Sequence, residues 1–214
     1  MFKLYGWPNT RSLRAVWALE EAGAEYEYVA VNLTRGEGRR PSYLSVNPGG
    51  KVPTLIDGDL TLTESAAICC YVGDTHPASG LTPPCGTRQR AMHDKWCYFV
   101  LSELEQPLWT MGKHRFALPE KRRVPAIMET AAWEFSVAAK TLASRFGDGP
   151  FVLGEQFTVA DILIGHTLAW AEAWNIPLEH EHLREYARHL QQRPALIRAR
   201  QREGESVTPA PSHA

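Results

Sequence analysis

The chain has 214 residues, and 23 Lys and Arg side chains against 24 Asp and Glu side chains leave a formal net charge of −1. Hydrophobic residues make up 44% and charged residues 22%, which is typical of a globular protein and excludes a disordered tail protein. Residues 1–77 carry 7 basic and 9 acidic side chains, and the remainder carries 16 and 15. Neither part has the concentrated basic charge that nucleic-acid binding requires. No segment approaches ~18 consecutive apolar residues, so we also expect no membrane association.

The first third alternates strand and helix patterns. Residues 2–5 and 26–31 are predicted strands, and apolar residues at helical spacing predict a helix over 12–22 that stops at Gly23. A short helix is expected near 40–46. The strands VPTLID and LTLT follow, and Gly58 between them indicates a hairpin. A helix then begins at Glu64-Ser65, which gives the order βαβαββα.

Residues 75–87 are rich in Pro, Gly, Ser and Thr, a composition typical of a linker. We therefore predict an α/β domain over 1–76, a linker over 77–87 and an all-α domain over 88–202. The all-α domain is expected to contain helices over 88–112, 121–146, 158–173 and 181–191. The polar, Pro-rich residues 203–214 are predicted to form a flexible tail.

One helix start in the all-α domain carries a clear signal. Thr158 and Asp161 have the spacing of a capping box, in which the acid accepts from the backbone N–H at the start of the helix. The helix that follows is apolar nearly all round, so we expect it to be the buried centre of this domain. A structural role is therefore predicted for Asp161.

The four cysteines show no CxxC or Cys/His ligand spacing, and Cys69 and Cys70 are adjacent within the apolar run AAICCYV. We interpret this pair as buried small hydrophobic side chains, with redox sensing as the alternative. Pro8, Asn9 and Arg11 stand where a secretory signal would need apolar residues. These features favour a cytoplasmic protein without a bound metal.

Two segments could bind an extended, peptide-like ligand. If the Val52–Pro53 bond were cis, the Val52 backbone N–H and C=O would be free to pair with a ligand, although a trans proline at a strand edge is the commoner case. Ser65 lies at a helix start, where backbone N–H groups attract anions, and Glu64 precedes it. Lys51 could meet a second carboxylate. The alternatives are helix capping by Glu64 or Ser65 and a solvated Lys51.

The turn Pro8-Asn9-Thr10-Arg11-Ser12 is a third candidate site. Its hydroxyl groups and the N–H groups of the following helix could hydrogen-bond to a thiolate and stabilise it. A thiol ordinarily has a pKa of ~8.5, and lowering it by about two units requires near 2.7 kcal/mol of preference for the anion. N-capping by Asn9 or Thr10 is an equally consistent interpretation.

Four motifs now indicate a family: YGWPNTRSLRAVWALEEAGAEYEYV, NPGGKVPTLID, LTLTESAAI and GEQFTVADILIG. In order and spacing they resemble the glutathione transferase superfamily, and the bacterial cytosolic members with a Ser/Thr-like active site in particular. The resemblance covers nearly the whole chain. It implies a thioredoxin-like N-terminal domain, an all-helical C-terminal domain and a homodimer.

The same resemblance implies roles for the candidate residues, with glutathione as a co-substrate. Val52 would pair with its cysteinyl backbone beside a cis Pro53. Glu64 and Ser65 would hold its γ-glutamyl end, and Lys51 would approach its glycyl carboxylate.

The resemblance places three candidates near the thiol: Thr10 first, and Asn9 or Ser12 as alternatives. Tyr5 lies two or three residues early for the tyrosine-type position. Arg11 replaces the cysteine of the cysteine-type classes, which disfavours a mixed disulfide at that residue.

A pocket for a small hydrophobic electrophile is expected between the domains, with these aromatic, Met and His residues as candidates: Trp7, Trp109, Met111, His114 and Phe116. The predicted function is glutathione transfer to that electrophile, in detoxification. Two alternatives stay open, a glutathione-dependent disulfide reductase or peroxidase, and a noncatalytic interaction or regulatory module.

Overall fold

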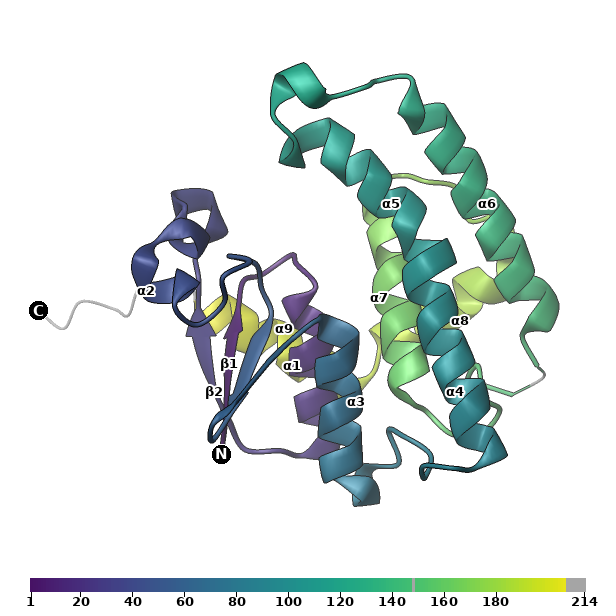
Figure 1. Ribbon diagram of the computed structural model, residues 1–214. Coiled ribbons are helices and arrows are strands. Elements are labelled where there is room, and N and C mark those ends of the chain that lie inside the picture. Colours follow the sequence, from purple (N-terminus) through teal and green to yellow (C-terminus); the bar gives the residue numbers. More distant parts are fainter. Residues whose placement is uncertain (148, 207–214) are drawn as a thin grey trace, which may run out of the picture. The chain divides into compact units, whose positions relative to one another are not determined.

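The computed structural model describes residues 1–147 and 149–206. The chain forms two compact units (Figure 1). The first unit contains Met1–Thr82 together with the segment that begins at Gln192, and the second contains Pro83–Gln191.

The first unit is built on a mixed four-stranded sheet with the strand order β2-β1-β3-β4. Strands β1 (Phe2–Gly6) and β2 (Tyr26–Ala30) are parallel, whereas β3 (Thr54–Asp57) is antiparallel to both β1 and β4 (Leu60–Thr63). The predicted hairpin is confirmed, and Gly58 between β3 and β4 has a φ of 58°, which a glycine adopts without steric cost.

Helices α1 (Ser12–Ala22) and α3 (Ser65–Thr75) pack side by side in this unit (Figure 1). Buried apolar side chains of the helices and the sheet form its core, among them Leu4, Val16, Trp17, Leu55 and Ile68. The predicted short helix is α2 (Pro41–Leu44), preceded by two short 3₁₀ turns. The element order βαβαββα and the thioredoxin-like arrangement are confirmed.

Helix α9 (Pro194–Glu205) was not predicted, and it packs against α1 of the first unit rather than with the helices of the second. Two ion pairs join α9 and the residue before it to α1. Arg193 binds Glu21 through two hydrogen bonds of 2.6 and 2.8 Å, and Arg198 donates to Glu20 at 2.8 Å. Residues 203–205 are therefore helical rather than part of a tail, while 207–214 lie outside the described residues.

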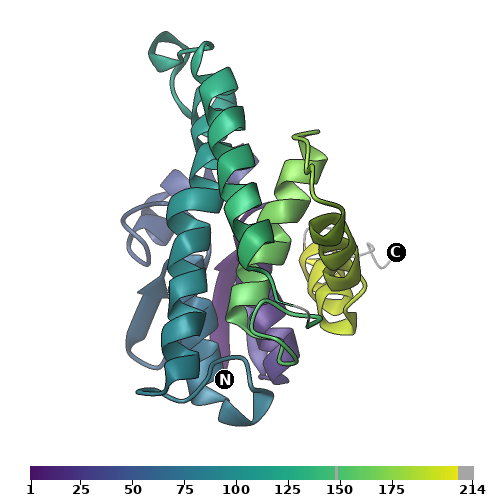
Figure 2. The same ribbon diagram turned by 90° about the vertical axis from the view of Figure 1, so that its right-hand side faces the viewer.

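The second unit is all-helical, as predicted. Its helices are α4 (Arg88–Phe99), α5 (Glu105–Gly112), α6 (Ile127–Arg145), α7 (Val159–Ala173) and α8 (Glu181–Gln191). The predicted helix 88–112 contains a π-helical turn at Val100–Leu104, and a second one, Lys113–Ala117, extends it. Helices α5 and α6 lie side by side (Figure 2). None of the helices in the described parts of the chain has the length and apolar character needed to cross a membrane.

Helix α7 begins with the predicted capping box between Thr158 and Asp161. The Asp161 carboxylate is buried and accepts four hydrogen bonds, from the Thr158 N–H and hydroxyl, from the Val152 N–H and from the Tyr186 hydroxyl. Burial raises the pKa of Asp161, and these four donors oppose that rise. The predicted buried helix and the structural role of Asp161 are both confirmed.

The four cysteines all lie within the described residues, and no disulfide joins them. Cys69 is fully buried, and burial raises the pKa of its thiol far above the ordinary value. A thiol that resists ionisation is a poor nucleophile, so the structure favours the interpretation of Cys69 as a buried hydrophobic side chain. Cys70 is only half-buried, so the expectation that both cysteines of the pair are buried is wrong for Cys70.

Candidate functional site

The sheet brings three of the predicted segments to one edge. Tyr5 of β1 pairs with Thr54 of β3, and Thr54 pairs with Thr63 of β4. Because β1 is antiparallel to β3 and β3 to β4, the end of β1, the start of β3 and the end of β4 meet at the same edge. The turn 7–12, the segment 51–53 and the pair Glu64-Ser65 therefore emerge next to one another.

The Val52–Pro53 peptide bond is cis, as the family resemblance implied. Val52 is half-buried and precedes the first residue of β3 by two positions. In the described part of the chain, neither its N–H nor its C=O takes part in a hydrogen bond. This free pair of backbone groups could bind an extended peptide in the manner of an added strand.

The segment before Val52 is held in place by two side chains. Asn47 donates through Nδ2 to the Lys51 carbonyl at 2.8 Å and to Thr54 Oγ1 at 3.0 Å. The Tyr43 hydroxyl donates to the same Lys51 carbonyl at 2.6 Å, and burial raises its pKa. The sequence analysis did not assign this role to Asn47 or Tyr43. The available signal was the Asn-Pro-Gly-Gly turn, which begins at Asn47.

Two glycines allow this loop to approach the 3₁₀ turn before α2. A Cβ atom on Gly50 would lie 2.5 Å from the Gly38 carbonyl oxygen, and one on Gly38 would lie 2.6 Å from the Gly50 carbonyl oxygen. Gly50 also has a φ of 61°, which side-chain-bearing residues rarely adopt. Lys51, which follows Gly50, is exposed.

Glu64 and Ser65 join β4 to α3. Glu64 is exposed and has φ 66° and ψ 112°, an uncommon conformation for a residue with a side chain. Ser65 is the first residue of α3, whose first turn contains no acidic residue. An anion is favoured at such a helix start, because the N–H groups there have no helical acceptor.

Arg14 is a site residue that sequence reasoning missed. It is fully buried on α1, and its Nη1 lies 3.4 Å from the Ser65 hydroxyl oxygen, which links the starts of α1 and α3. Its spacing was the available signal, because Arg14 precedes the buried residues Trp17 and Ala18 by three and four positions. A cation on this apolar face indicates a polar partner.

The turn before α1 is organised by hydroxyl groups. Thr10 Oγ1 accepts from the Ser12 N–H at 3.1 Å, and it lies 2.7 Å from the Trp7 carbonyl oxygen and 2.9 Å from Ser12 Oγ. Ser12 Oγ also accepts from the Trp7 N–H at 3.2 Å. Ser12 is fully buried, whereas Thr10 is half-buried. Of these two hydroxyl groups, only that of Thr10 can be reached by a ligand without a rearrangement of the turn.

Asn9 is exposed and has a φ of 59°. Asn tolerates this left-handed conformation better than most residues, which explains its presence in the turn by backbone geometry alone. Tyr5 is half-buried within β1, and its ring centroid lies 5.6 Å from that of Tyr43.

The residues predicted to line the electrophile pocket lie in both units. Trp7 belongs to the first unit and is half-buried, as is Trp109 in the second. Met111 is only 3% exposed, within the core of the second unit. His114 accepts through Nδ1 from the Val124 N–H at 3.0 Å, and Phe116 is 57% exposed.

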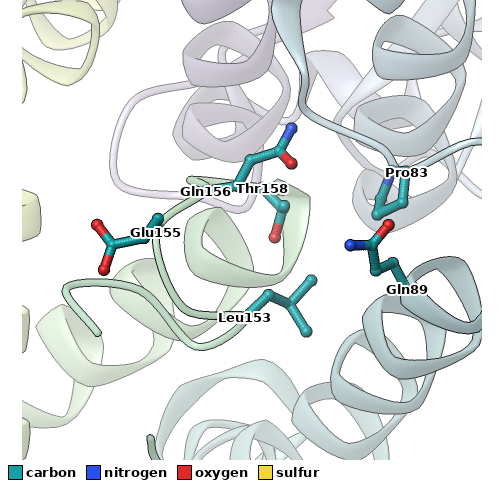
Figure 3. Close-up of a pocket in the computed structure, with 6 residues that line it drawn as sticks. All are labelled: Pro83, Gln89, Leu153, Glu155, Gln156 and Thr158. Atoms are coloured by element: carbon teal, nitrogen blue, oxygen red, sulfur yellow. The ribbon is translucent and has the colours of Figure 1, made fainter. Parts of the chain in front are cut away.

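A cavity of about 270 Å³ lies in the second unit and is lined by Pro83, Gln89, Leu153, Glu155, Gln156 and Thr158. Figure 3 shows Gln89 and Leu153 pointing toward each other, while the carboxylate of Glu155 points away. The Thr158 hydroxyl already donates to Asp161. None of the predicted site residues lines this cavity.

Comparison with known proteins decides the family. Residues 1–74 match the family "Glutathione S-transferase, N-terminal domain", and residues 138–204 match "Glutathione S-transferase, C-terminal domain". The chain is 34% identical over 165 residues to glutathione S-transferase 4 of Zea mays, covering 75% of this chain and 73% of that protein. The chain belongs to the glutathione S-transferase family.

Three further proteins are similar to this chain. The chain is 28% identical to the disulfide-bond oxidoreductase YfcG of Escherichia coli K12, over 81% of this chain and 80% of that protein. Its fold is similar to the glutathione transferase of Methylococcus capsulatus, with a TM-score of 0.85, 32% identity and coverage of 96% and 100%. A sphingomonad glutathione S-transferase complexed with glutathione gives a TM-score of 0.82 at 33% identity, with coverage of 94% and 98%.

Proposed function

We propose that this protein binds reduced glutathione at the sheet edge of its first unit and transfers the thiolate to a small apolar electrophile. One observation carries the proposal: the free backbone pair of Val52, the α3 start at Ser65 and the Thr10 turn emerge at one edge of the sheet. An extended tripeptide needs a backbone partner, a site for each charged end and a site for its thiol. This edge offers all four.

Each group of the tripeptide has a matching partner. Val52 would pair with the cysteinyl backbone, and the exposed Lys51 would meet the glycyl carboxylate. The γ-glutamyl carboxylate would accept from the Ser65 N–H and hydroxyl, and the Glu64 carboxylate would accept from the γ-glutamyl ammonium group. Arg14, buried behind Ser65, would hold that hydroxyl in position.

Thr10 is the proposed donor to the thiolate. Its single hydroxyl proton can serve the Trp7 carbonyl, Ser12 Oγ or a bound sulfur, one at a time. The Ser12 N–H fixes the Thr10 oxygen and the first turn of α1 contains no acidic residue, so an anion there meets donors and no repelling carboxylate. Ser12 then acts through Thr10, and Asn9 contributes the shape of the turn.

The reaction requires no metal or general base. The bound thiol loses its proton to water, and the sulfur electron pair forms a bond to the electrophilic carbon. A leaving group departs with its bonding pair, or, in an addition, the product carbon takes a proton from water. The protein contributes position and anion stabilisation.

Substitution of Thr10 tests the proposal. Thr10→Ala is expected to lower kcat/KM for glutathione and a neutral aryl halide by about 10- to 100-fold and to raise the pKa of the bound thiol. Thr10→Ser, which keeps the hydroxyl, is expected to retain activity. If Thr10→Ala keeps full activity and Asn9→Ala or Ser12→Ala loses it, Thr10 is not the donor to the thiolate and another residue of the turn is.

A disulfide reductase is the second candidate, because a relative at 28% identity is named a disulfide-bond oxidoreductase. In that reaction one glutathione thiolate attacks a disulfide, a thiolate leaves, and a second glutathione completes the reduction as oxidised glutathione forms. Comparing an aryl halide with bis(2-hydroxyethyl) disulfide as substrates separates the two activities. Glutathione-agarose retention without either activity would instead favour a noncatalytic module.

We further propose a cytoplasmic homodimer with a role in detoxification. The absence of disulfides among the four cysteines supports a reducing compartment.

Large apolar side chains are exposed on the second unit, among them Met92 and Tyr98 on α4 and Trp133 and Val137 on α6. Such side chains are typical of a subunit interface. Tyr98→Lys combined with Trp133→Lys is expected to halve the mass measured by light scattering.

A further inference from the structure

An open pocket of about 370 Å³ lies in the first unit, at the edge of the sheet opposite the candidate site. Phe2 begins β1 and Asp57 ends β3, which is antiparallel to β1, so both residues meet at this edge. The residues around the pocket that bear on its chemistry are Phe2, Gly23, Glu25, Asp57 and His76. Its volume falls in the range of about 300–1,000 Å³ that is usual for small-molecule sites.

Helices α1 and α3, which lie side by side (Figure 1), both end at this pocket. Gly23 directly follows α1, His76 directly follows α3, and both residues line the pocket. The C-terminal end of a helix carries about half an elementary negative charge. A basic side chain in the last turn often offsets that charge, but the last turns of α1 and α3 contain none. The two helix ends therefore give the pocket a negative potential.

Two carboxylates add to this potential. Asp57 is half-buried, and its Oδ2 accepts from the Tyr71 hydroxyl at 2.8 Å, which leaves Oδ1 for a ligand. Glu25 is exposed, and no hydrogen bond or ion pair within the described residues involves its side chain. The charge of the nearby Lys3 is already paired, because its Nζ lies 3.1 Å from a carboxylate oxygen of Glu27.

Two rings supply the apolar part of the pocket. The ring centroids of Phe2 and His76 lie 5.7 Å apart, and Phe2 is buried beneath the opening. His76 Nδ1 lies 3.2 Å from the Val72 carbonyl oxygen, and a hydrogen bond there places the proton on Nδ1. In the neutral imidazole, Nε2 is then a further acceptor. The pocket thus combines acceptors with apolar surface and contains few donors.

A metal ion fits this pocket poorly. Metal ligands must converge on one point, since their bonds to the ion are only about 2.0–2.6 Å long. Within the described residues, Asp57, Glu25 and His76 belong to no group of three His, Cys, Asp or Glu side chains whose ligand atoms lie within 4.8 Å of one another. Negative groups that are spread along a pocket suit a cation whose charges are separated by an apolar chain.

We propose that this pocket binds small linear diamines. One ammonium group would donate to Asp57 near the end of α3, the other would donate to Glu25 near the end of α1, and the methylene chain would pack against Phe2 and His76. An ammonium group has three donors and no acceptor, which matches carboxylates and helix-end carbonyls. No residue of the candidate site takes part, so the proposal does not depend on the glutathione chemistry.

The test titrates the full-length protein with putrescine (1,4-diaminobutane) and with 1-aminobutane, by calorimetry at constant ionic strength. Putrescine is expected to bind about tenfold more tightly, because its second ammonium group adds charge-assisted hydrogen bonds. Magnesium chloride at the same concentration is expected not to displace it. Equal affinities for the two amines, no binding of putrescine, or displacement by magnesium would overturn the proposal.

Three variants locate the effect. Glu25→Gln, a change to an exposed side chain, and Asp57→Asn, which keeps an acceptor for Tyr71, are each expected to abolish the preference for the diamine. Asp59→Asn, an equal charge change in the β3–β4 loop, is expected to keep it. If Asp59→Asn loses the preference to the same extent, the effect comes from the general negative charge of this region and the proposal is wrong.

A competition experiment separates this pocket from the candidate site. Because the two lie at opposite edges of the sheet, saturating glutathione is expected to leave the affinity for putrescine unchanged. If glutathione displaces putrescine, the amine binds at the candidate site, where Glu64 offers a carboxylate, and the assignment to this pocket is wrong.

Discussion

A threonine hydroxyl lies near the start of both α1 and α7, but only α7 has a carboxylate in its first turn. At α7, Asp161 in the first turn accepts four buried hydrogen bonds and completes the helix start from within. At α1, the Thr10 and Ser12 hydroxyl groups and the backbone carbonyls of Thr10 and Arg11 organise the turn, and the first turn contains no acidic residue.

This difference separates a structural helix start from one available to a ligand. A helix start that contains its own carboxylate has satisfied its donors and its dipole, so an external anion gains little there. A start without one leaves its dipole available to a bound anion. Helix α3 is of the second kind, because its first turn also lacks an acidic residue.

Removing the Asp161 carboxylate from α7 should have the largest effect on stability. Asp161→Ala would leave four buried donors without an acceptor, so we expect the free energy of unfolding to fall by about 3–5 kcal/mol in urea titrations. Glu172→Ala on the exposed part of the same helix is the control, with an expected change within about 0.5 kcal/mol. A loss below about 1 kcal/mol in Asp161→Ala would contradict the structural role.

Glu203 on α9 is a buried acid with far fewer donors than Asp161. It is 3% exposed, and its one hydrogen-bond partner among the described residues is the Tyr28 hydroxyl at 3.3 Å. Burial raises the pKa of Glu203 to about 8 from an ordinary value near 4.5. Between about pH 4.5 and about pH 8, the Glu203 carboxyl group is therefore protonated in the folded chain and ionised in the unfolded chain.

Because the folded state binds the extra proton, the free energy of unfolding should decrease as the pH rises from about 4.5 to about 8. The contribution is complete below about pH 4.5 and is lost above about pH 8, with a magnitude of roughly 2–4 kcal/mol. Glu203→Gln should remove this dependence and stabilise the protein at pH 8. Urea titrations across this range provide the measurement, and an unchanged slope in Glu203→Gln would disprove the assignment.

Substitution of Glu64 tests whether a ligand binds at the start of α3. Glu64→Gln should weaken glutathione binding about tenfold in calorimetry, because a neutral amide replaces the proposed partner of the γ-glutamyl ammonium group. Stability should not change, since the side chain is exposed and the backbone keeps its conformation. Asp59→Asn, an equal charge change in the β3–β4 loop, is the control. Equal affinities in the two variants would remove Glu64 from the proposed site.

The smallest expected effect comes from giving α1 the carboxylate that it lacks. Leu13→Glu places an acid in the first turn, where at about 7 Å in water-like surroundings it would repel a thiolate by roughly 0.6 kcal/mol. The pKa of bound glutathione, measured by thiolate absorbance, should rise by about 0.4 units. Leu13→Gln controls for the loss of the leucine. A lowered pKa would argue against a thiolate at this helix start.

Parts of the candidate site were predictable because they depend on local signals. The Asn-Pro-Gly-Gly turn, the helix start at Glu64-Ser65 and the hydroxyls of the first turn are all read from neighbouring residues. The role of Arg14 could not be predicted in this way, because its partner Ser65 is 51 positions away. The distinction between Thr10 and Ser12 also needed coordinates, since both carry a hydroxyl and only their burial differs.

The sequence by itself determined the strands, the helices α1, α3, α7 and α8, and the capping box, because hydrophobic periodicity and capping act over a few residues. Only the tertiary structure decided where α9 belongs. That helix is polar and rich in arginine, and Glu20 and Glu21, which bind Arg198 and the preceding Arg193, lie more than 170 positions away. The same holds for the sheet edge, since long-range pairing, rather than local preference, brings such distant residues together.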